Sequence, residues 1–163
     1  VADDKTMYYY VPDMISYYLN EEPIIPNVKT YLLNKKETLN YVLDHLHELV
    51  VKNVGASGGY DMLIGPQATE EEIQRFKEKI IKAPYQYVAQ PTITLSRAPA
   101  YQNNRFYPCH VDLRVFVFSG VNSYVLPGGL SRVALKEGSL VVNSSQGGGG
   151  KDTWVLKEGL INA

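Results

Sequence analysis

The spacing of hydrophobic residues changes along the chain, and each spacing predicts a different element. Near the start, Val11, Ile15 and Leu19 fall four residues apart and would line one face of a helix. Residues 3–20 are therefore expected to be helical, with Pro12 at a kink or in the first turn of a second helix. The apolar face indicates that this segment packs against another layer of the protein.

Two further helices are predicted over residues 34–47 and 70–82, where apolar residues again recur three and four positions apart. Each starts with a pair of side chains that can form a capping box: Asn34 with Glu37, and Thr69 with Glu72. The residues expected to be buried are Leu39, Val42, Leu43, Leu46, Ile73, Phe76, Ile80 and Ile81.

Runs rich in β-branched and aromatic residues predict strands between and after these helices. The predicted strands are residues 30–33, 49–54, 62–64, 85–90, 93–95, 110–119, 123–126, 141–143 and 154–156. Residues 98–108 are expected to form a loop, residues 127–129 to end a strand, and residues 147–150 to form a flexible glycine loop. The order of elements predicts an α+β fold with antiparallel pairs prominent, in lobes at residues 1–85 and 86–163.

Composition narrows the classes of protein. With 163 residues, 45% hydrophobic and 20% charged, the chain can bury a core, and its net charge of −1 argues against a nonspecific nucleic-acid binder. The single cysteine, Cys109, excludes an internal disulfide and fits a cytoplasmic protein. No signal peptide or run of membrane-spanning length occurs. Because the chain begins at Val1 without Met, it is expected to be part of a longer polypeptide.

The segment 49–61 carries the clearest indication of chemistry. A β-branched run contains one lysine, Lys52, and then opens into a glycine-rich loop. The loop residues of interest are Gly55, Ser57, Gly58 and Gly59. A lysine at the end of a buried strand needs an anion, and a glycine-rich turn leaves backbone N–H groups exposed. A phosphate site and a surface hairpin with a snorkelling lysine explain these residues equally well.

Arginines in apolar surroundings form a second group of candidates. Arg114 lies within the run 110–119, and Arg132 follows a glycine pair. A guanidinium donates two parallel N–H bonds to a phosphate or a carboxylate. Asp112 would share a strand face with Arg114, so this pair fits a cross-sheet ion pair as well as a ligand site.

Two polar segments at strand ends are weaker candidates. Backbone groups of the strand that ends at Gln90 are able to bond an adenine edge, although an ordinary strand explains them better. Asn143 and the small polar residues 144–148 suit an anionic ligand. His45 and His47 lie two apart on a predicted helix and face different ways, so no metal ligands are assigned.

Taken in order, seven segments resemble the circularly permuted ATP-grasp family, which is related to glutathionylspermidine synthase-like amide ligases. They are VADDK (1–5), YVPDMISYYL (10–19), ELVVKNVGASGGYDMLIGP (48–66), YVAQPTITLSR (87–97), VDLRVFVFSG (111–120), PGGLSRVA (127–134) and NSSQGGGGKDTWV (143–155). They span nearly the whole chain and are specific as an ordered set. The resemblance implies an ATP-grasp-like α+β fold that is circularly permuted and incomplete in this chain.

The resemblance also implies an ATP site. Lys5 resembles the family's first lysine, near the α-phosphate, and Lys52 resembles the second. The loop from Gly55 to Gly59 would fold over the β- and γ-phosphates, and Gln90 would line the adenine hinge. ATP is therefore the expected cofactor.

The second half would contribute to the reaction. By the same resemblance, Arg114 and Arg132 would steady the transferring phosphoryl group, and Asn143 would help to hold phosphate or substrate. The implied reaction activates a small-molecule carboxylate as an acyl-phosphate, which an amine attacks to give an amide.

The family binds Mg²⁺ through acidic residues and an asparagine on strands that, in the permuted order, precede the VADDK segment. Those ligands are therefore expected to lie outside this chain, and this fragment alone is expected to be inactive. Two alternatives remain: a nucleotide-binding module without turnover, and a structural interaction domain with tyrosine-rich surfaces.

Overall fold

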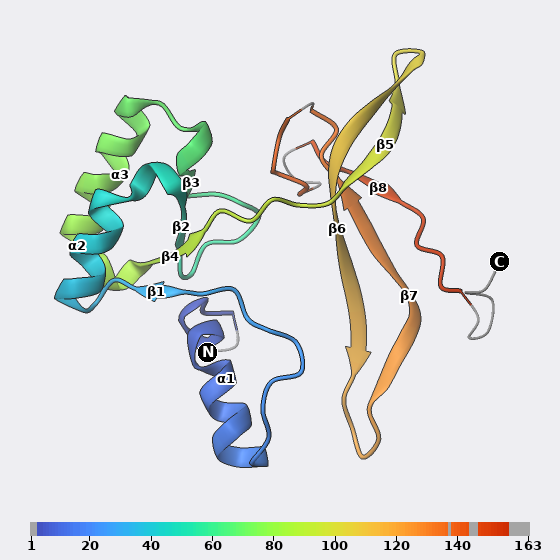
Figure 1. Cartoon of the computed structure of the whole chain (residues 1–163), viewed down its shortest axis with the longest axis horizontal. Helices are drawn as coiled ribbons and strands as arrows, with labels where there is room; N and C mark the ends of the chain where they lie inside the picture. Colours follow the sequence, from blue (N-terminus) through green and yellow to red (C-terminus); the bar gives the residue numbers. More distant parts are fainter. Residues whose placement is uncertain (1–2, 137, 144–146, 157–163) are drawn as a thin grey trace. The chain divides into compact units, whose positions relative to one another are not determined.

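The chain has an α+β fold in a computed structural model that describes residues 3–136, 138–143 and 147–156. The helices in this part are α1 (Thr6–Leu19), α2 (Lys36–Asp44) and α3 (Glu70–Lys82), with 3-10 turns at Leu46–Glu48, Gly65–Gln67 and Pro84–Gln86. The strands are β1 (Tyr31–Leu32), β2 (Leu49–Asn53), β3 (Met62–Ile64), β4 (Tyr87–Pro91), β5 (Arg97–Gln102), β6 (Arg105–Phe118), β7 (Tyr124–Val133) and β8 (Gly149–Lys151). They fall into two units, Val1–Ile93 and Thr94–Ala163 (Figure 1).

Helix α1 is one continuous helix with Pro12 inside it, so the proline does not start a second helix, which was one of the two positions that the sequence allowed. Proline has no backbone N–H, so the carbonyl of Tyr8, four residues earlier, loses its helical donor. The side chain of Asn27 supplies a replacement, because its Nδ2 donates to the Tyr8 carbonyl at 3.1 Å. This contact also ties the segment after α1 back onto the helix.

The capping chemistry was predicted correctly for α3 but not for α2. At α3, the Glu72 N–H donates to Thr69 Oγ1 at 3.3 Å, and the Thr69 N–H donates to the Glu72 carboxylate at 2.9 Å. At α2, Lys35 occupies the extended N-cap position and makes no side-chain cap, so Asn34 lies one residue too early to cap. That helix also ends at Asp44, before the 3-10 turn.

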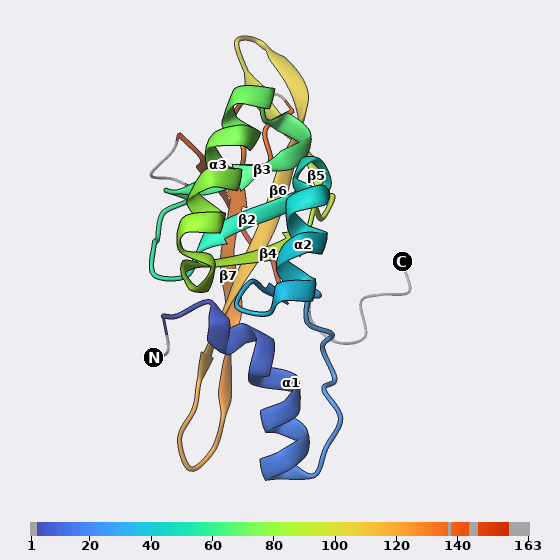
Figure 2. The same cartoon turned by 90° about the vertical axis from the view of Figure 1, so that its left-hand side faces the viewer.

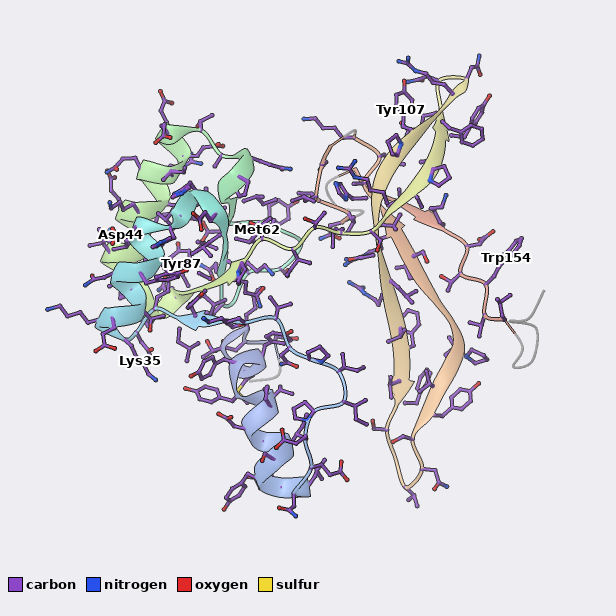
Figure 3. All side chains as sticks on the ribbon, viewed as in Figure 1. Lys35, Asp44, Met62, Tyr87, Tyr107 and Trp154 are labelled. Carbon is purple, nitrogen blue, oxygen red and sulfur yellow. The ribbon has the colours of Figure 1, made fainter. Side chains whose placement is uncertain are left out.

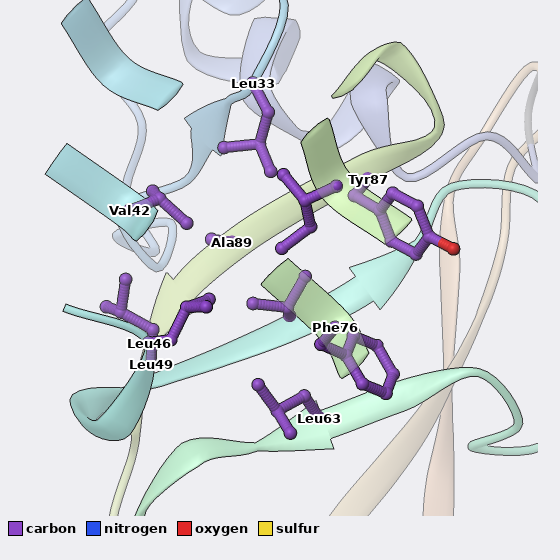
Figure 4. Packing of buried hydrophobic residues seen from close by; sticks show 10 residues of the cluster. Leu33, Val42, Leu46, Leu49, Leu63, Phe76, Tyr87 and Ala89 are labelled. Atoms are coloured by element: carbon purple, nitrogen blue, oxygen red, sulfur yellow. The ribbon is translucent and has the colours of Figure 1, made fainter. Parts of the chain in front are cut away.

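The sheet of the first unit has the strand order β1-β4-β2-β3, with antiparallel neighbours among the described residues. Helices α2 and α3 cover one face of it (Figure 2). Alternate strand residues point to that face, where Val51, Leu63 and Ala89 pack with Val42 of α2 and Ile80 of α3 (Figure 4). Full burial of each large aliphatic side chain stabilises the fold by about 1.5–3 kcal/mol.

One residue of the predicted core lies outside it. Ile81 is 57% exposed, whereas its neighbour Ile80 is fully buried. Successive residues of a helix point about 100° apart, so α3 presents only one of these two isoleucines to the sheet. The residues predicted to be buried on this helix therefore included one residue too many.

The sheet of the second unit has the order β5-β6-β7-β8, again antiparallel. The predicted loop at residues 98–108 is instead the β5–β6 hairpin. Its turn is Asn103–Asn104, and both residues have positive φ (49° and 61°), which is the conformation that a two-residue hairpin turn needs. Asparagine tolerates that conformation better than most residues, so this pair was a turn signal that the sequence analysis missed.

Residues 127–129 continue β7, although they were expected to end a strand. Gly129 pairs with Val115, next to an irregularity in the β6–β7 register. A Cβ at Gly129 would lie 2.8 Å from the carbonyl oxygen of Arg114. Glycine here permits a close approach of the two strands, which explains why it does not interrupt them.

Three of the predicted strands are absent from the described part of the chain. Residues 93–95, 141–143 and 154–156 are not strands, and Trp154 projects into solvent with 86% exposure (Figure 3). Part of the predicted glycine loop forms β8, which pairs with β7 through Arg132 and Gly150. Residues 144–146, which were weighed for anion binding, lie outside the described part of the chain.

Gly65→Ala is expected to destabilise the chain by about 3 kcal/mol or more, because overpacking against backbone cannot be relieved by a rotamer change. A Cβ at this buried position would lie 1.9 Å from the carbonyl oxygen of Leu46 and 2.8 Å from that of Leu49. Urea unfolding followed by circular dichroism measures the change. Gly128→Ala is the control, since its Cβ would meet nothing within 4 Å. Equal stability of both variants would contradict this packing.

Candidate functional site

A cavity of about 400 Å³ opens on the first unit, within the range typical of small-molecule sites. The side chains that line it are Lys5, Tyr8, Val28, Lys52, Val88 and Gln90. They come from the start of α1, the segment before β1, and the paired strands β2 and β4. Three of the residues that the sequence singled out therefore meet at one cavity: Lys5, Lys52 and Gln90.

Strand pairing explains why Lys52 and Gln90 share this cavity. Lys52 pairs directly with Val88 in the antiparallel register of β2 and β4, so their side chains project from the same face. Gln90 lies two residues beyond Val88 and points to that face as well. The intervening residues, Val51 and Ala89, point the other way into the core. One face of the sheet thus anchors the fold and the other lines the cavity.

The Lys52 ammonium lies in a half-buried position and donates to Gln90 Oε1 at 2.7 Å. Burial lowers the pKa of Lys52 below 10.5, and the nearby positive charge of Lys5 lowers it further. Both effects arise because the charged form lacks water and lacks a compensating negative charge. An incoming anion would relieve both.

Lys5 connects the helix α1 to the glycine-rich loop. It occupies the N-cap position of α1, and its backbone N–H donates to the carbonyl of Val54 at 3.2 Å. Its ammonium donates to the carbonyl of Val54 at 3.4 Å and also to that of Ala56. The charge of Lys5 is therefore held between the cavity and the loop.

The loop after β2 is fixed at its base by Asp61. The carboxylate accepts hydrogen bonds from Lys79 at 2.6 Å, Asn53 at 2.9 Å and Tyr87 at 3.1 Å. Burial alone would raise the pKa of Asp61, but these three donors together hold that pKa below its usual value. Asp61 thereby attaches the end of the loop to α3 and β4.

Two glycines give the loop its shape. Gly58 and Gly59 have φ of 68° and 78°, values that other residues rarely adopt. Gly55 and Ser57, by contrast, are exposed, and the Gly55 N–H donates to Asn53 Oδ1 at 3.0 Å. The role of this loop in covering phosphates stays a prediction.

The cavity carries two lysines, and no ion pair among the described residues balances their positive charge. Within residues 3–136, 138–143 and 147–156, the ion pairs are His47–Glu48, Lys79–Asp61 and Arg132–Asp112. Neither lysine of the cavity takes part in them. The same residues contain no group of three His, Cys, Asp or Glu side chains able to hold a metal ion.

The remaining predicted residues lie in the second unit. Arg132 donates through Nε and Nη2 to the Asp112 carboxylate at 2.9 Å and 2.5 Å, and these bonds raise the pKa of Arg132. Asp112 thus pairs with Arg132, its direct partner in the β6–β7 register. Arg114 is exposed on β6, opposite Leu130. Asn143 follows β7, and its carbonyl accepts from the Gly148 N–H at 3.0 Å.

Sequence reasoning missed Tyr8, Val28 and Val88 as cavity residues. Tyr8 lies three residues after Lys5 on the same helix face, so the helical period alone would have found it. Its hydroxyl accepts from the Val28 N–H at 2.7 Å and holds that segment beside the cavity. Val28 and Val88 carry no chemical signal, and only the fold shows where they lie.

The sequence of this chain is similar to one family model and to several known proteins. Residues 1–134 match the family model described as "Circularly permuted ATP-grasp type 2". An uncharacterized protein of Synechocystis sp. is 57% identical over 158 residues, which cover 96% of this chain and 33% of that protein. An uncharacterized protein of Mycobacterium tuberculosis is 50% identical, over 96% of this chain and 28% of its own length.

A further relative carries a functional name. The Frankia casuarinae protein named "Putative glutamate--cysteine ligase 2-2" is 47% identical over 95% of this chain and 18% of its own length. The chain therefore spans a third or less of the length of these relatives. No helix in the described part of the chain has the length and apolar character needed to cross a membrane.

The half-buried position of Lys52 predicts a specific dependence of stability on pH. The pKa of Lys52 is lower in the folded chain than the ordinary 10.5, so between these values the unfolded chain binds more protons at this residue. The free energy of unfolding then rises with pH across that window. Unfolding of the wild type and of Lys52→Met, from neutral pH to about pH 10, isolates this residue. The wild type should gain stability relative to Lys52→Met as the pH rises; a constant difference would contradict the assigned burial.

Proposed function

The chain belongs to the circularly permuted ATP-grasp type 2 family, and on that premise we propose that its first unit binds ATP for a carboxylate–amine ligase. The observation that carries the proposal is the cavity beside two lysines that no carboxylate balances within the described residues. A triphosphate supplies the missing negative charge. The name of the Frankia casuarinae relative supports the ligase class.

The residues of the cavity fit the phosphate part of ATP. The ammonium groups of Lys5 and Lys52 would bind its oxygens by charge-assisted hydrogen bonds. The loop from Gly55 to Gly59 begins beside Lys5 and would close over the outer phosphates. Gln90 would act at the same wall by holding Lys52.

Arg132, Arg114 and Asn143 complete the proposal in the second unit. A fixed orientation supports this role for Arg132, because two hydrogen bonds to Asp112 hold the plane of its guanidinium. A fixed guanidinium stabilises the charge of a transferring phosphoryl group without reorganising. Arg114 and Asn143 would contact the phosphoryl group or the substrate carboxylate.

When bound, ATP would supply the phosphoryl group that activates a carboxylate, and an amine would then displace it to form an amide. The protein's share of this reaction is positioning and neutralisation of charge. Mg²⁺ normally accompanies ATP in such sites. In this proposal its protein ligands belong to parts of the full-length protein outside the described residues.

Lys52→Met is expected to weaken ATP binding about 10- to 100-fold, because a hydrogen bond to a charged group contributes about 1.5–3 kcal/mol. Isothermal titration of the full-length protein with ATP measures the affinity. Lys35→Met is the matched control, since Lys35 is exposed at the start of α2 and points away from the sheet (Figure 3). An affinity unchanged by Lys52→Met, or lowered equally by Lys35→Met, would refute the proposed site.

The alternative is a nucleotide-binding module without turnover. Phosphate release from ATP in the presence of a mixture of carboxylates and amines separates the two functions. The ligase predicts release that requires both substrates in the full-length protein. Tight ATP binding without release under any such mixture would favour the binding module.

A further inference from the structure

A chain of hydrogen bonds leads from the cavity to a buried residue that does not line it. Lys52 Nζ donates to Gln90 Oε1 at 2.7 Å, and Gln90 Nε2 donates to Thr30 Oγ1 at 2.9 Å. The Thr30 hydroxyl then donates to the carbonyl of Val28 at 3.0 Å. Thr30 is only 8% exposed.

The groups at the two ends of this series of hydrogen bonds determine which group donates and which accepts in each bond. An ammonium group only donates hydrogen bonds, and a backbone carbonyl only accepts them. The oxygen of the Gln90 amide must therefore face Lys52, and its nitrogen must face Thr30. A reversed amide would place an NH₂ group against the ammonium and leave two donors opposed. Because each hydrogen bond polarises the next, this series of bonds makes the Gln90 oxygen a stronger acceptor for Lys52.

Strand pairing places Thr30 where this role requires it. In the β1–β4 register, Tyr31 pairs with Ala89 and Leu32 with Val88. Continuing the register by one residue sets Thr30, which directly precedes β1, opposite Gln90. The hydroxyl thus reaches Gln90 from the neighbouring segment of the sheet.

We propose that Thr30 is a positioning residue for Lys52, acting through the orientation that it imposes on the Gln90 amide. The proposal deepens the ATP site and rests on that proposed function. With the amide fixed, the Lys52 ammonium is held at the cavity wall before any ligand arrives, so less ordering accompanies binding. Without the hydroxyl, Gln90 loses its acceptor and Lys52 loses a fixed partner.

Thr30→Val tests this role because it keeps the shape of the side chain and removes the hydroxyl. In the full-length protein, ATP affinity should fall about five- to tenfold, the effect of losing one hydrogen bond in the site. Thr30→Ser keeps the hydroxyl and should stay within about twofold of the wild type. Should Thr30→Val fail to fold in a melting experiment, Thr30→Cys, whose sulfur is a weak acceptor, replaces it with a smaller loss expected.

Two readouts separate positioning from a general loss of structure. In a Lys52→Met background, Thr30→Val should cause no further loss of affinity, because its effect passes through Lys52. In the wild-type background, Thr30→Val should move the alkaline loss of ATP binding to lower pH, since the ammonium is then less stabilised. An equal loss of affinity in both backgrounds, or an unmoved alkaline limb, would overturn the proposal.

A ligand-free measurement keeps the two proposals distinguishable. The pH dependence of unfolding, taken as the difference between a protein that retains Lys52 and its Lys52→Met counterpart, reports the titration of Lys52 without ATP. Thr30→Val should shift that titration to lower pH whether or not ATP is the ligand. If the shift occurs and Lys52→Met leaves ATP affinity unchanged, the ATP site fails but the positioning role stands. If Lys52→Met weakens ATP binding and no shift occurs, only the positioning role fails.

Discussion

The first unit is arranged around a half-buried lysine, Lys52, that is hydrogen-bonded to an amide and forms no ion pair with a carboxylate of the described residues. An amide oxygen is a weaker partner than a carboxylate, so Lys52 is restrained but its charge is not neutralised. A carboxylate at that place would satisfy the lysine and would compete with any incoming anion. The cavity instead carries excess positive charge that a polyanion would neutralise, and the second lysine, Lys5, adds to that charge.

The positively charged cavity and the hydrophobic core lie on opposite faces of the sheet of the first unit. Alternation along β2 sends Val51 into the core beneath α2 and α3 and Lys52 into the cavity. Tyr87 links the core to the loop after β2. Its ring packs in the core (Figure 4), and its hydroxyl donates to Asp61 at the base of the loop. The loop that would cover a ligand is therefore attached through Asp61 to α3 and β4, and glycines make up much of the loop itself.

The sequence predicted the features that depend on local chemistry. The Thr69–Glu72 capping box predicted the start of α3, and apolar runs predicted strands β2 and β3. The same reasoning could not find contacts between residues that are distant in sequence. Asn27 donates to the Tyr8 carbonyl that Pro12 leaves without its helical donor, and Thr30 reaches Gln90 across sixty residues. Spacing along the chain reveals neither contact, since both exist only after the chain has folded.

We propose that Lys5 and Lys52 hold a triphosphate in the cavity of the first unit. A crystal structure of the full-length protein with a non-hydrolysable ATP analogue tests it most directly. The phosphate oxygens should lie within about 3 Å of both ammonium groups, with Gln90 still oriented toward Thr30. An analogue bound elsewhere, with Lys52 contacting only Gln90 and no phosphate, would contradict the claim.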